Sequence, residues 1–280
     1  MNFFNNPFVH IRDKDTVERK IWTFSLWKTQ IVTDYDATMT RADWEHSWSI
    51  FEGNAAFSSG YKEEAKAFFE YYHAQEIDSS ISPEDKDIIM HKWWNSCLNL
   101  FIKHRLHYSH IDEMLSNGHS MEFREWFKEF IEQAYGYSIP VVIFSAGVSN
   151  IIERFLSIQN SNFSNIHIVS NCLRFWDDWI CNWFESDIIH SHNKSEHEIS
   201  SLIQEHIRSK SDIILLGDSL SDIEMIDQDK RKDALNIAFV SGNKLMSMSD
   251  FINTFDIVIE SAKDTHNVPI DILSEIAKNT

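Results

Sequence analysis

The sequence predicts an α/β fold, a Rossmann-like parallel sheet flanked by helices, with an inserted helical-bundle cap. In the second half of the chain, short apolar and β-branched runs alternate with helical segments, which is typical of parallel strands joined by right-handed crossovers. A similar run at residues 31–33 ends in acidic residues, and a purely helical block separates it from the later strands. We therefore expect an α/β core of residues 1–58 and 119–280 and a helical cap of residues 59–118.

The individual elements follow from the spacing of apolar residues. A helical period predicts helices over residues 13–27, 61–74, 83–103, 109–117, 121–134, 150–156, 196–209, 221–227 and 243–251. Ser82 and Pro83 form a strong helix start, because a capping serine precedes a proline that fits the first helical position. Short β-branched runs predict strands over residues 31–33, 139–144, 166–169, 188–189, 212–216, 237–240 and 256–259.

Composition and charge restrict the classes of function. Of the 280 residues, 43% are hydrophobic, which predicts a folded globular chain. The 25 basic and 43 acidic residues give a net charge of −18, so we expect no nucleic-acid partner and no anionic-membrane partner. No apolar run reaches the roughly 18 residues that span a bilayer. The first residues carry mixed charges, so we expect no secretory signal.

The cysteines and glycines exclude further classes. The chain has three cysteines, an odd number without metal-ligand spacing: Cys97, Cys172 and Cys181. This cysteine usage favours a reducing compartment, so we expect a cytoplasmic protein. The seven glycines form neither a dinucleotide-binding fingerprint nor a Walker A loop. Nothing in the sequence specifies an oligomeric state.

Two aspartates, Asp34 and Asp36, end the first predicted strand, and Thr38 follows them. Two carboxylates at one strand end repel each other unless a cation or a reaction uses them. Ligands of open α/β sheets also bind at the carboxyl ends of the strands. We therefore interpret Asp34 as a nucleophile in phosphoryl transfer. The alternative from these residues alone is an acidic turn that closes the strand.

Polar groups also follow two later strands. Ser145, Ala146 and Gly147 stand between a strand and a helix, where a hydroxyl and free backbone N–H groups form an anion site. Asp218 and Asp222 are four residues apart after another strand, so they could share one cation or hold one lysine. The alternative for this pair is a helix cap and a first-turn acid.

Lys194 lies between an apolar run and a predicted helix, where its ammonium could neutralise a phosphate oxygen. Three histidines, His190, His192 and His197, stand near it in the sequence. His190 and His192 would share one strand face, but no cysteine or acid completes a convincing zinc site. We therefore expect solvated or hydrogen-bonded histidines.

The order of these motifs is more specific than any one of them. Each motif stands at the end of a predicted element, in the order Asp-x-Asp-x-Thr, strand-Ser, Lys and Gly-Asp-x-x-x-Asp. A chain with this order of motifs resembles the haloacid dehalogenase superfamily of phosphatases. Within that superfamily the chain is similar to the cytosolic pyrimidine 5′-nucleotidase family. The similarity covers about residues 27–259 and is carried by cap segments 70–78, 83–84 and 92–94 and core segments 143–147, 165–171, 189–194 and 213–219.

The resemblance implies a mechanism and a cofactor. Asp34 would form an aspartyl-phosphate, and Asp36 would act as general acid and then as general base. The cofactor would be Mg²⁺, held by the Asp34 and Asp218 carboxylates and the Asp36 backbone carbonyl. The resemblance also implies that Ser145, the Ala146 N–H and Lys194 would bind the phosphate oxygens. It implies supporting roles for Thr38, Ser219 and Asp222.

The same resemblance implies a small phosphorylated substrate, a nucleoside 5′-monophosphate with pyrimidine preferred. Glu76 matches the family's cap glutamate that reads the base, and Trp94 matches the aromatic residue that stacks on it. The alternatives for these two residues are a solvated helix-end acid and a core aromatic.

The chain departs from the family pattern at three positions near the expected base site. Ala42 stands where the family has an aromatic residue, although Trp44 follows it, Leu98 replaces a histidine and Ser221 replaces a glycine. These departures affect the base pocket and leave the phosphate chemistry intact. Two alternatives therefore stay open: a phosphatase for another small phosphomonoester, and a catalytically silent binding protein of the same fold.

Overall fold

The computed structural model describes residues 1–53, 59–78, 80–116, 121–184, 188–190, 193–194, 210–261 and 267–279. The α-helices are α1 (Lys14–Thr23), α2 (Ile50–Gly53), α3 (Ser59–Glu76), α4 (Pro83–Lys103), α5 (Tyr108–Ser116), α6 (Phe127–Gly136), α7 (Ser149–Ile158), α9 (Met248–Thr254) and α10 (Val268–Lys278). The strands are β1 (Val9–Ile11), β2 (Thr29–Thr33), β3 (Val141–Val148), β4 (Ile166–Asn171), β5 (Leu173–Phe175), β6 (Cys181–Phe184), β7 (Asp212–Gly217), β8 (Leu235–Val240) and β9 (Ile257–Glu260). Short 3₁₀ helices are η1 (Asn2–Asn5), η2 (Leu26–Lys28), η4 (Leu220–Met225) and η5 (Gly242–Ser247).

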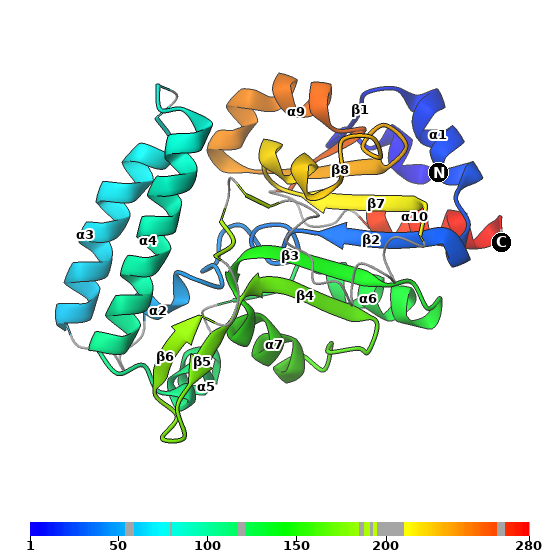
Figure 1. The fold of residues 1–280 in the computed structure, drawn as a ribbon. Coiled ribbons are helices and arrows are strands. Elements are labelled where there is room, and N and C mark those ends of the chain that lie inside the picture. Colours follow the sequence, from blue (N-terminus) through cyan, green and yellow to red (C-terminus); the bar gives the residue numbers. More distant parts are fainter. Residues whose placement is uncertain are drawn as a thin grey trace.

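A seven-stranded sheet with the order β1-β9-β8-β7-β2-β3-β4 forms the centre of the fold (Figure 1). All neighbouring strands are parallel except β1, which pairs with β9 in the antiparallel sense. Thr33 is level with Ile143 of β3 and with Leu216 of β7. The residues that follow these three strands therefore meet at one edge of the sheet.

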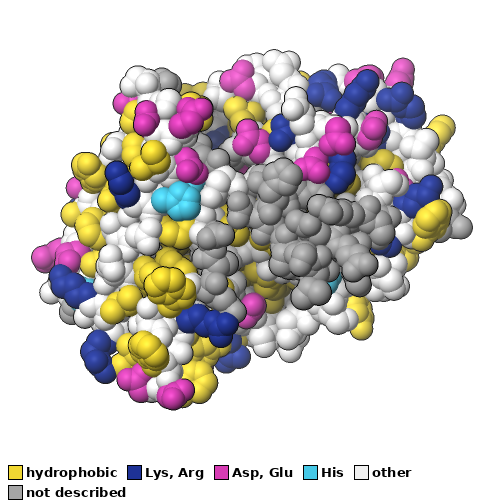
Figure 2. Space-filling view, viewed as in Figure 1, with side chains coloured by type: hydrophobic (Ala, Val, Ile, Leu, Met, Phe, Trp, Pro, Cys, Tyr) yellow, Lys and Arg dark blue, Asp and Glu magenta, His cyan; other side chains and the backbone are white. Residues whose placement is uncertain are grey.

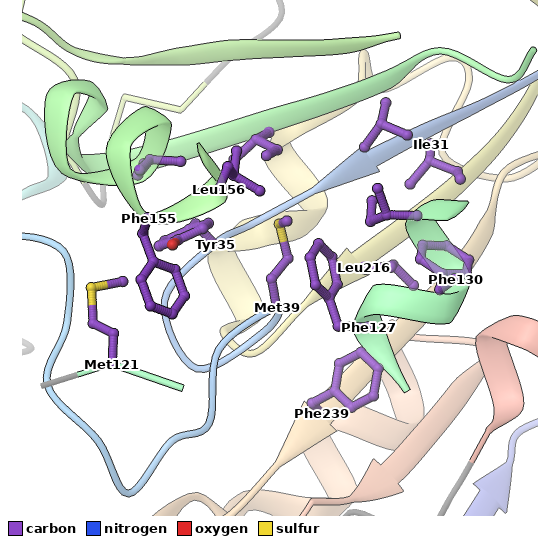
Figure 3. Packing of buried hydrophobic residues seen from close by; sticks show 14 of the residues in the cluster. Ile31, Tyr35, Met39, Met121, Phe127, Phe130, Phe155, Leu156, Leu216 and Phe239 are labelled. Carbon is purple, nitrogen blue, oxygen red and sulfur yellow. The ribbon is translucent and has the colours of Figure 1, made fainter. Parts of the chain in front are cut away.

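Helices cover both faces of this sheet. Ile31 and Leu216 point to the face that is covered by α1, α6, α7 and α10, and Figure 3 shows them near Phe127 and Phe130 of α6. The opposite face carries Val32 and Leu215 and packs against η4 and α9. Strands buried on both faces explain why the sequence shows continuous apolar runs instead of alternation.

Between β2 and β3 the chain forms helices α2 to α6. The α3 and α4 helices lie side by side beyond the carboxyl ends of the strands (Figure 1). The Ser82 hydroxyl caps α4 by accepting the Asp85 N–H, as the sequence predicts. Residues 58, 118 and 119, at the boundaries of the predicted cap, lie outside the described residues. The division into core and cap therefore stays a prediction.

The segment before Lys194 is not the strand that its apolar residues predict. Residues 188–190 are irregular, because side-chain amides take the place of a strand partner. Asn171 bonds to both the N–H and the carbonyl of Ile189 at 2.8 Å, and Asn193 accepts the His190 N–H at 2.7 Å. The predicted helix over residues 196–209 lies outside the described residues, as do His192 and His197.

Four predicted helices differ in extent or type. The first ends at Thr23 and not at residue 27, where η2 follows. The helix predicted from residue 121 begins at Phe127, because residues 121–124 instead bridge to Thr40 and hydrogen-bond to the backbone of residues 39–41. The segment predicted as a helix over residues 221–227 is the 3₁₀ helix η4, which is closed by a capping box between Ser219 and Asp222. The helix predicted over residues 243–251 is divided between the 3₁₀ helix η5 and the α-helix α9, which extends to Thr254.

Three further elements, β1, α10 and the antiparallel hairpin β5–β6, are not among those predicted from the sequence. Trp176, Trp179 and Trp183 of the hairpin region are 65%, 57% and 65% exposed, and Figure 2 shows hydrophobic side chains over this part of the surface. Among the described residues, no helix is both long and apolar enough to cross a membrane.

Candidate active site

Asp34 and Lys194 form the centre of the site. Asp34 directly follows β2, and its backbone N–H donates to the Leu216 carbonyl at 3.0 Å. Lys194 Nζ lies 2.5 Å from Asp34 Oδ1 and 3.3 Å from Asp222 Oδ1. All three side chains are buried. The structure thus brings the predicted nucleophile and the predicted phosphate-binding lysine into direct contact.

Asp36 is held by a residue that the sequence analysis did not identify. Its Oδ1 accepts the Ser47 N–H at 2.7 Å, and its Oδ2 accepts the Ser47 hydroxyl at 2.6 Å. These two bonds fix the carboxyl group, and Asp36 and Asp34 line the same cavity. No local signal distinguishes Ser47 from other loop serines, because the contact depends on how residues 37–49 fold back.

The loop after Asp36 adopts a backbone conformation that has to be stabilised. Ala37 has φ 61°, in the left-handed region that non-glycine residues rarely occupy. Its N–H donates to the Thr40 hydroxyl, and its carbonyl accepts from the buried Arg124 guanidinium at 2.5 Å. Arg124 also donates to the Thr38 carbonyl at 2.8 Å. The loop is therefore held by Thr40 and Arg124, while the buried Thr38 hydroxyl has no hydrogen-bond partner among the described atoms.

Ser145 and Ala146 lie at the carboxyl end of β3, on the wall of the same cavity. The Ser145 hydroxyl accepts the Gly147 N–H at 3.0 Å, which leaves its own proton available for an anion. The absence of a side chain at Gly147 also allows Ser47 to approach closely, because a Cβ atom at position 147 would lie 1.7 Å from Ser47 Oγ.

Asp218 and Asp222 have different environments. Asp222 Oδ2 accepts the N–H groups of Asp218 and Ser219, both at 2.9 Å, while its Oδ1 faces Lys194. Asp222 therefore positions both the lysine and the loop. The Asp218 carboxylate instead contacts Lys244 Nζ, which also donates to the Asp218 carbonyl at 3.0 Å. Lys244 comes from η5, far enough along the chain that its spacing carries no signal.

The site concentrates buried charge, which shifts the pKa values of its groups. Burial raises the pKa of Asp34 to about 8 against the opposing charge of Lys194. Burial also raises the pKa of Asp36, opposed by His46 and Ser47, and that of Asp218, opposed by Lys244. Burial alone would lower the pKa of Lys194, but the charges of Asp222 and Asp34 outweigh it and raise that pKa. Lys194 therefore stays charged, and an added cation would stabilise the carboxylates.

A cavity of about 620 Å³ extends from these groups to the helices of the predicted cap. Glu76 at the end of α3 and Trp94 of α4 both line it, as the resemblance implies, and so do Trp48, Phe69 and Trp93. From the loop after Asp36, the aromatic side chain that lines the cavity is Trp48 and not Trp44. Leu98 packs into the core, and Ser221 lines the cavity beside Ser219.

The sheet and these groups define the class of protein. An aspartate after the central parallel strand, a buried lysine in contact with it and further acids at the same sheet edge are the arrangement of a haloacid dehalogenase-type phosphatase. Residues 35–277 match the model of the family described as pyrimidine 5′-nucleotidase (UMPH-1), and the chain belongs to this family. It is therefore a phosphoric monoester hydrolase of the 5′-nucleotidase type.

Individual relatives are similar over most of the chain. The 7-methylguanosine phosphate-specific 5′-nucleotidase of Rattus norvegicus is 30% identical over 259 residues, which are 90% of this chain and 85% of that protein. The protein of the same name from Gallus gallus is 28% identical and covers 90% of this chain and 89% of its own length. A crystal structure of cytosolic 5′-nucleotidase IIIB bound to cytidine has a TM-score of 0.89 and 27% identity and covers 99% of this chain and 96% of that chain.

Proposed function

We propose that this protein hydrolyses nucleoside 5′-monophosphates, with pyrimidine nucleotides preferred, through an aspartyl-phosphate on Asp34 and with Mg²⁺ as its cofactor. One observation carries the proposal: a single described cavity joins Asp34 and Lys194 at one end to Glu76 and Trp94 at the other. A nucleotide needs phosphate chemistry and base contacts in one connected space. We also propose a cytoplasmic location, which the name of the cytosolic relative supports.

The chain's own residues supply the nucleophile and the proton transfers. Asp34 attacks phosphorus in line and forms the aspartyl-phosphate, while Asp36 gives its proton to the leaving 5′ oxygen. Asp36 then takes a proton from the water that attacks the aspartyl-phosphate, which releases phosphate and restores Asp34. Lys194, the Ser145 hydroxyl and the Ala146 N–H hold the phosphate oxygens. The raised pKa of Asp36 favours the protonated acid that the first step needs.

The residues around Asp34 fit Mg²⁺ by the chemistry of their donors. Carboxylate oxygens of Asp34, Asp218 and Asp222 lie within 4.8 Å of one another, and a hard cation prefers such an all-oxygen set. Both Asp222 oxygens already face other partners, so Asp34, Asp218 and the Asp36 carbonyl would hold the ion. When bound, Mg²⁺ reduces the repulsion between the phosphate dianion and the nucleophile.

A second candidate substrate, 7-methylguanosine 5′-monophosphate, is favoured by the walls of the cavity. Trp48 lies 5.6 Å from Trp93 and 6.0 Å from Phe69, measured between ring centroids, and Glu76 lines the same space. An N7-methylated guanine is cationic, and aromatic faces beside a carboxylate attract a cation. The names of the chicken and rat relatives agree with this substrate.

The nucleophile is tested with Asp34→Asn. This variant should lose Mg²⁺-dependent hydrolysis of p-nitrophenyl phosphate, because an amide cannot form the acyl-phosphate. Asp43→Asn is a matched control, since Asp43 carries an exposed carboxylate on the nearby loop. Thermal unfolding checks that both variants are folded. Unchanged turnover by Asp34→Asn would mean that the nucleophile is misassigned.

The substrate is tested with UMP, CMP, 7-methylguanosine monophosphate, GMP and sugar phosphates, with and without Mg²⁺. Faster turnover of UMP and CMP would support the pyrimidine preference, and faster turnover of the methylated nucleotide would support the second candidate. A preference for a sugar phosphate would contradict both. Glu76→Gln should raise KM for the nucleotide much more than KM for the aryl phosphate, whereas the exposed Glu70→Gln should change neither.

A further inference from the structure

A second cluster of metal-ligating side chains borders the substrate cavity and contains none of the residues assigned to the phosphate chemistry. Asp87 and His91 stand four residues apart on α4, and His190 stands in the irregular segment before Lys194. Among the described residues, one ligand atom from each of the three lies within 4.8 Å of the other two. We propose that these three residues form a site for a divalent transition-metal ion such as Zn²⁺, distinct from the Mg²⁺ site at Asp34 and Asp218.

The distances within the cluster are close to those that a tetrahedral ion requires. Asp87 Oδ1 is 3.1 Å from His190 Nε2 and 3.9 Å from His91 Nε2. Ligands about 2.05 Å from a tetrahedral centre are about 3.3 Å apart, so small side-chain rotations complete the geometry. The two imidazole rings are nearly perpendicular, with centroids 5.0 Å apart, and one ring nitrogen of each lies within 4.8 Å of the other and of an Asp87 carboxylate oxygen.

The chemistry of the cluster selects the kind of ion. Two imidazoles and one carboxylate are typical Zn²⁺ ligands, whereas Mg²⁺ prefers oxygen ligands alone. Three protein ligands leave a fourth position for water. The side chains of His91 and Asp87 are 40% and 45% exposed, so an ion can enter from solvent, while His190 is buried and fixed.

The site would tie two parts of the molecule together. His190 belongs to a segment that is already held by the side-chain amides of Asn171 and Asn193, which is the rigid support that a metal ligand needs. His190 also lines the substrate cavity, and Lys194 follows four residues later. A bound ion therefore links helix α4 to the segment that carries the phosphate-binding lysine.

Calorimetric titration of the full chain with Zn²⁺, in an excess of Mg²⁺, tests this site. We expect one Zn²⁺ per chain, with affinity weakened at least about 100-fold in His91→Ala and in Asp87→Asn, because loss of a direct ligand exceeds the effect of an outer-shell partner. Both replaced side chains are half exposed, so these variants should fold. Glu84→Gln, in the first turn of the same helix, is the matched control and should bind as the wild type does.

A second set of measurements separates this site from the active site. Asp34→Asn should keep Zn²⁺ binding, and Zn²⁺ should raise the thermal unfolding temperature of the wild type but not of His91→Ala. His190→Ala should also lose binding, with its fold checked by the same unfolding curve. Binding that survives in His91→Ala and Asp87→Asn but disappears in Asp34→Asn would overturn the proposal. Absence of Zn²⁺ binding by the wild type would overturn it as well.

Discussion

Gly147→Ala should damage the general acid without touching it. The added Cβ would lie 1.7 Å from Ser47 Oγ and 3.0 Å from Ser47 Cβ. Atoms in ordinary contact are about 3.5 Å apart, so the Ser47 side chain has to move by roughly 2 Å. The hydrogen bond of 2.6 Å that the Ser47 hydroxyl donates to Asp36 cannot survive such a movement, whereas the bond of 2.7 Å comes from the Ser47 backbone N–H. Asp36 then loses one of the two donors that orient it.

The size of the effect follows from these bonds. A hydrogen bond to a charged group contributes about 1.5–3 kcal/mol, and 1.36 kcal/mol corresponds to a factor of ten in rate. Loss of the hydroxyl bond should therefore lower kcat/KM about 10- to 150-fold. Because this bond lowers the pKa of Asp36, its loss should raise that pKa. The limb of the pH–rate profile that falls as Asp36 deprotonates should move to higher pH.

A double-mutant cycle with Ser47→Gly is the decisive assay, with kcat/KM measured across pH for a nucleoside 5′-monophosphate, whose 5′ alkoxide leaving group needs the proton of the general acid. Without the Ser47 side chain the clash disappears, so Gly147→Ala should cost little more in that background. Gly136→Ala is the matched control, because nothing lies within 4 Å of a Cβ at that position. The reasoning is refuted if Gly147→Ala stays within about twofold of wild type, or if its cost is equal in both backgrounds.

Four further predictions concern the acidic groups. Lys244→Ala should lower the Mg²⁺ concentration for half-maximal activity, because Lys244 pairs with the Asp218 carboxylate that would hold the ion. The change should be roughly two- to fivefold, since a half-exposed ion pair is worth at most about 1 kcal/mol. A higher Mg²⁺ requirement in a titration would show that Lys244 assists the metal. Burial raises the pKa of Asp34 from an ordinary 3.8 to about 8, so Asp34 carries a proton at neutral pH in the metal-free protein. Because the folded state then binds this proton more tightly than the unfolded state, the free energy of unfolding should fall as the pH rises from about 4 to about 8. Mg²⁺ binding at pH 7 should accordingly release a proton, and this release should decline as the pH rises through about 8. Calorimetry in buffers of different ionisation enthalpy measures the release. Gly217→Ala would place a Cβ atom 2.6 Å from Asp222 Cβ, whereas Gly136→Ala would place one in open space. Denaturant unfolding should show a loss of about 1–3 kcal/mol in the free energy of unfolding for Gly217→Ala and none for Gly136→Ala. Equal stability of the two variants would contradict the packing around Asp222.

The local pattern of the sequence predicted the parallel strands β2, β3, β4, β7, β8 and β9 and most helices to within a few residues. These elements are long or strongly apolar, so their periodicity is clear. The elements that were missed, such as β1 and the hairpin β5–β6, are short, and their pairing depends on distant segments. The prediction of a strand before Lys194 was wrong. Ile189 is buried as a strand residue would be, but Asn171 and not a neighbouring strand satisfies its backbone.

The sequence by itself determined which groups could take part in phosphate chemistry. Asp34, Ser145 and Asp218 each follow a strand, and parallel strands align their carboxyl ends, so order along the chain was enough to predict that they meet. Only the tertiary structure decided what surrounds them. Arg124 reaches Ala37 across 87 residues, and Ser47, Lys244 and the cluster of Asp87, His91 and His190 depend on similar long-range packing. Such contacts leave no periodic signal, because they arise from how separate elements pack and not from the spacing within any one of them.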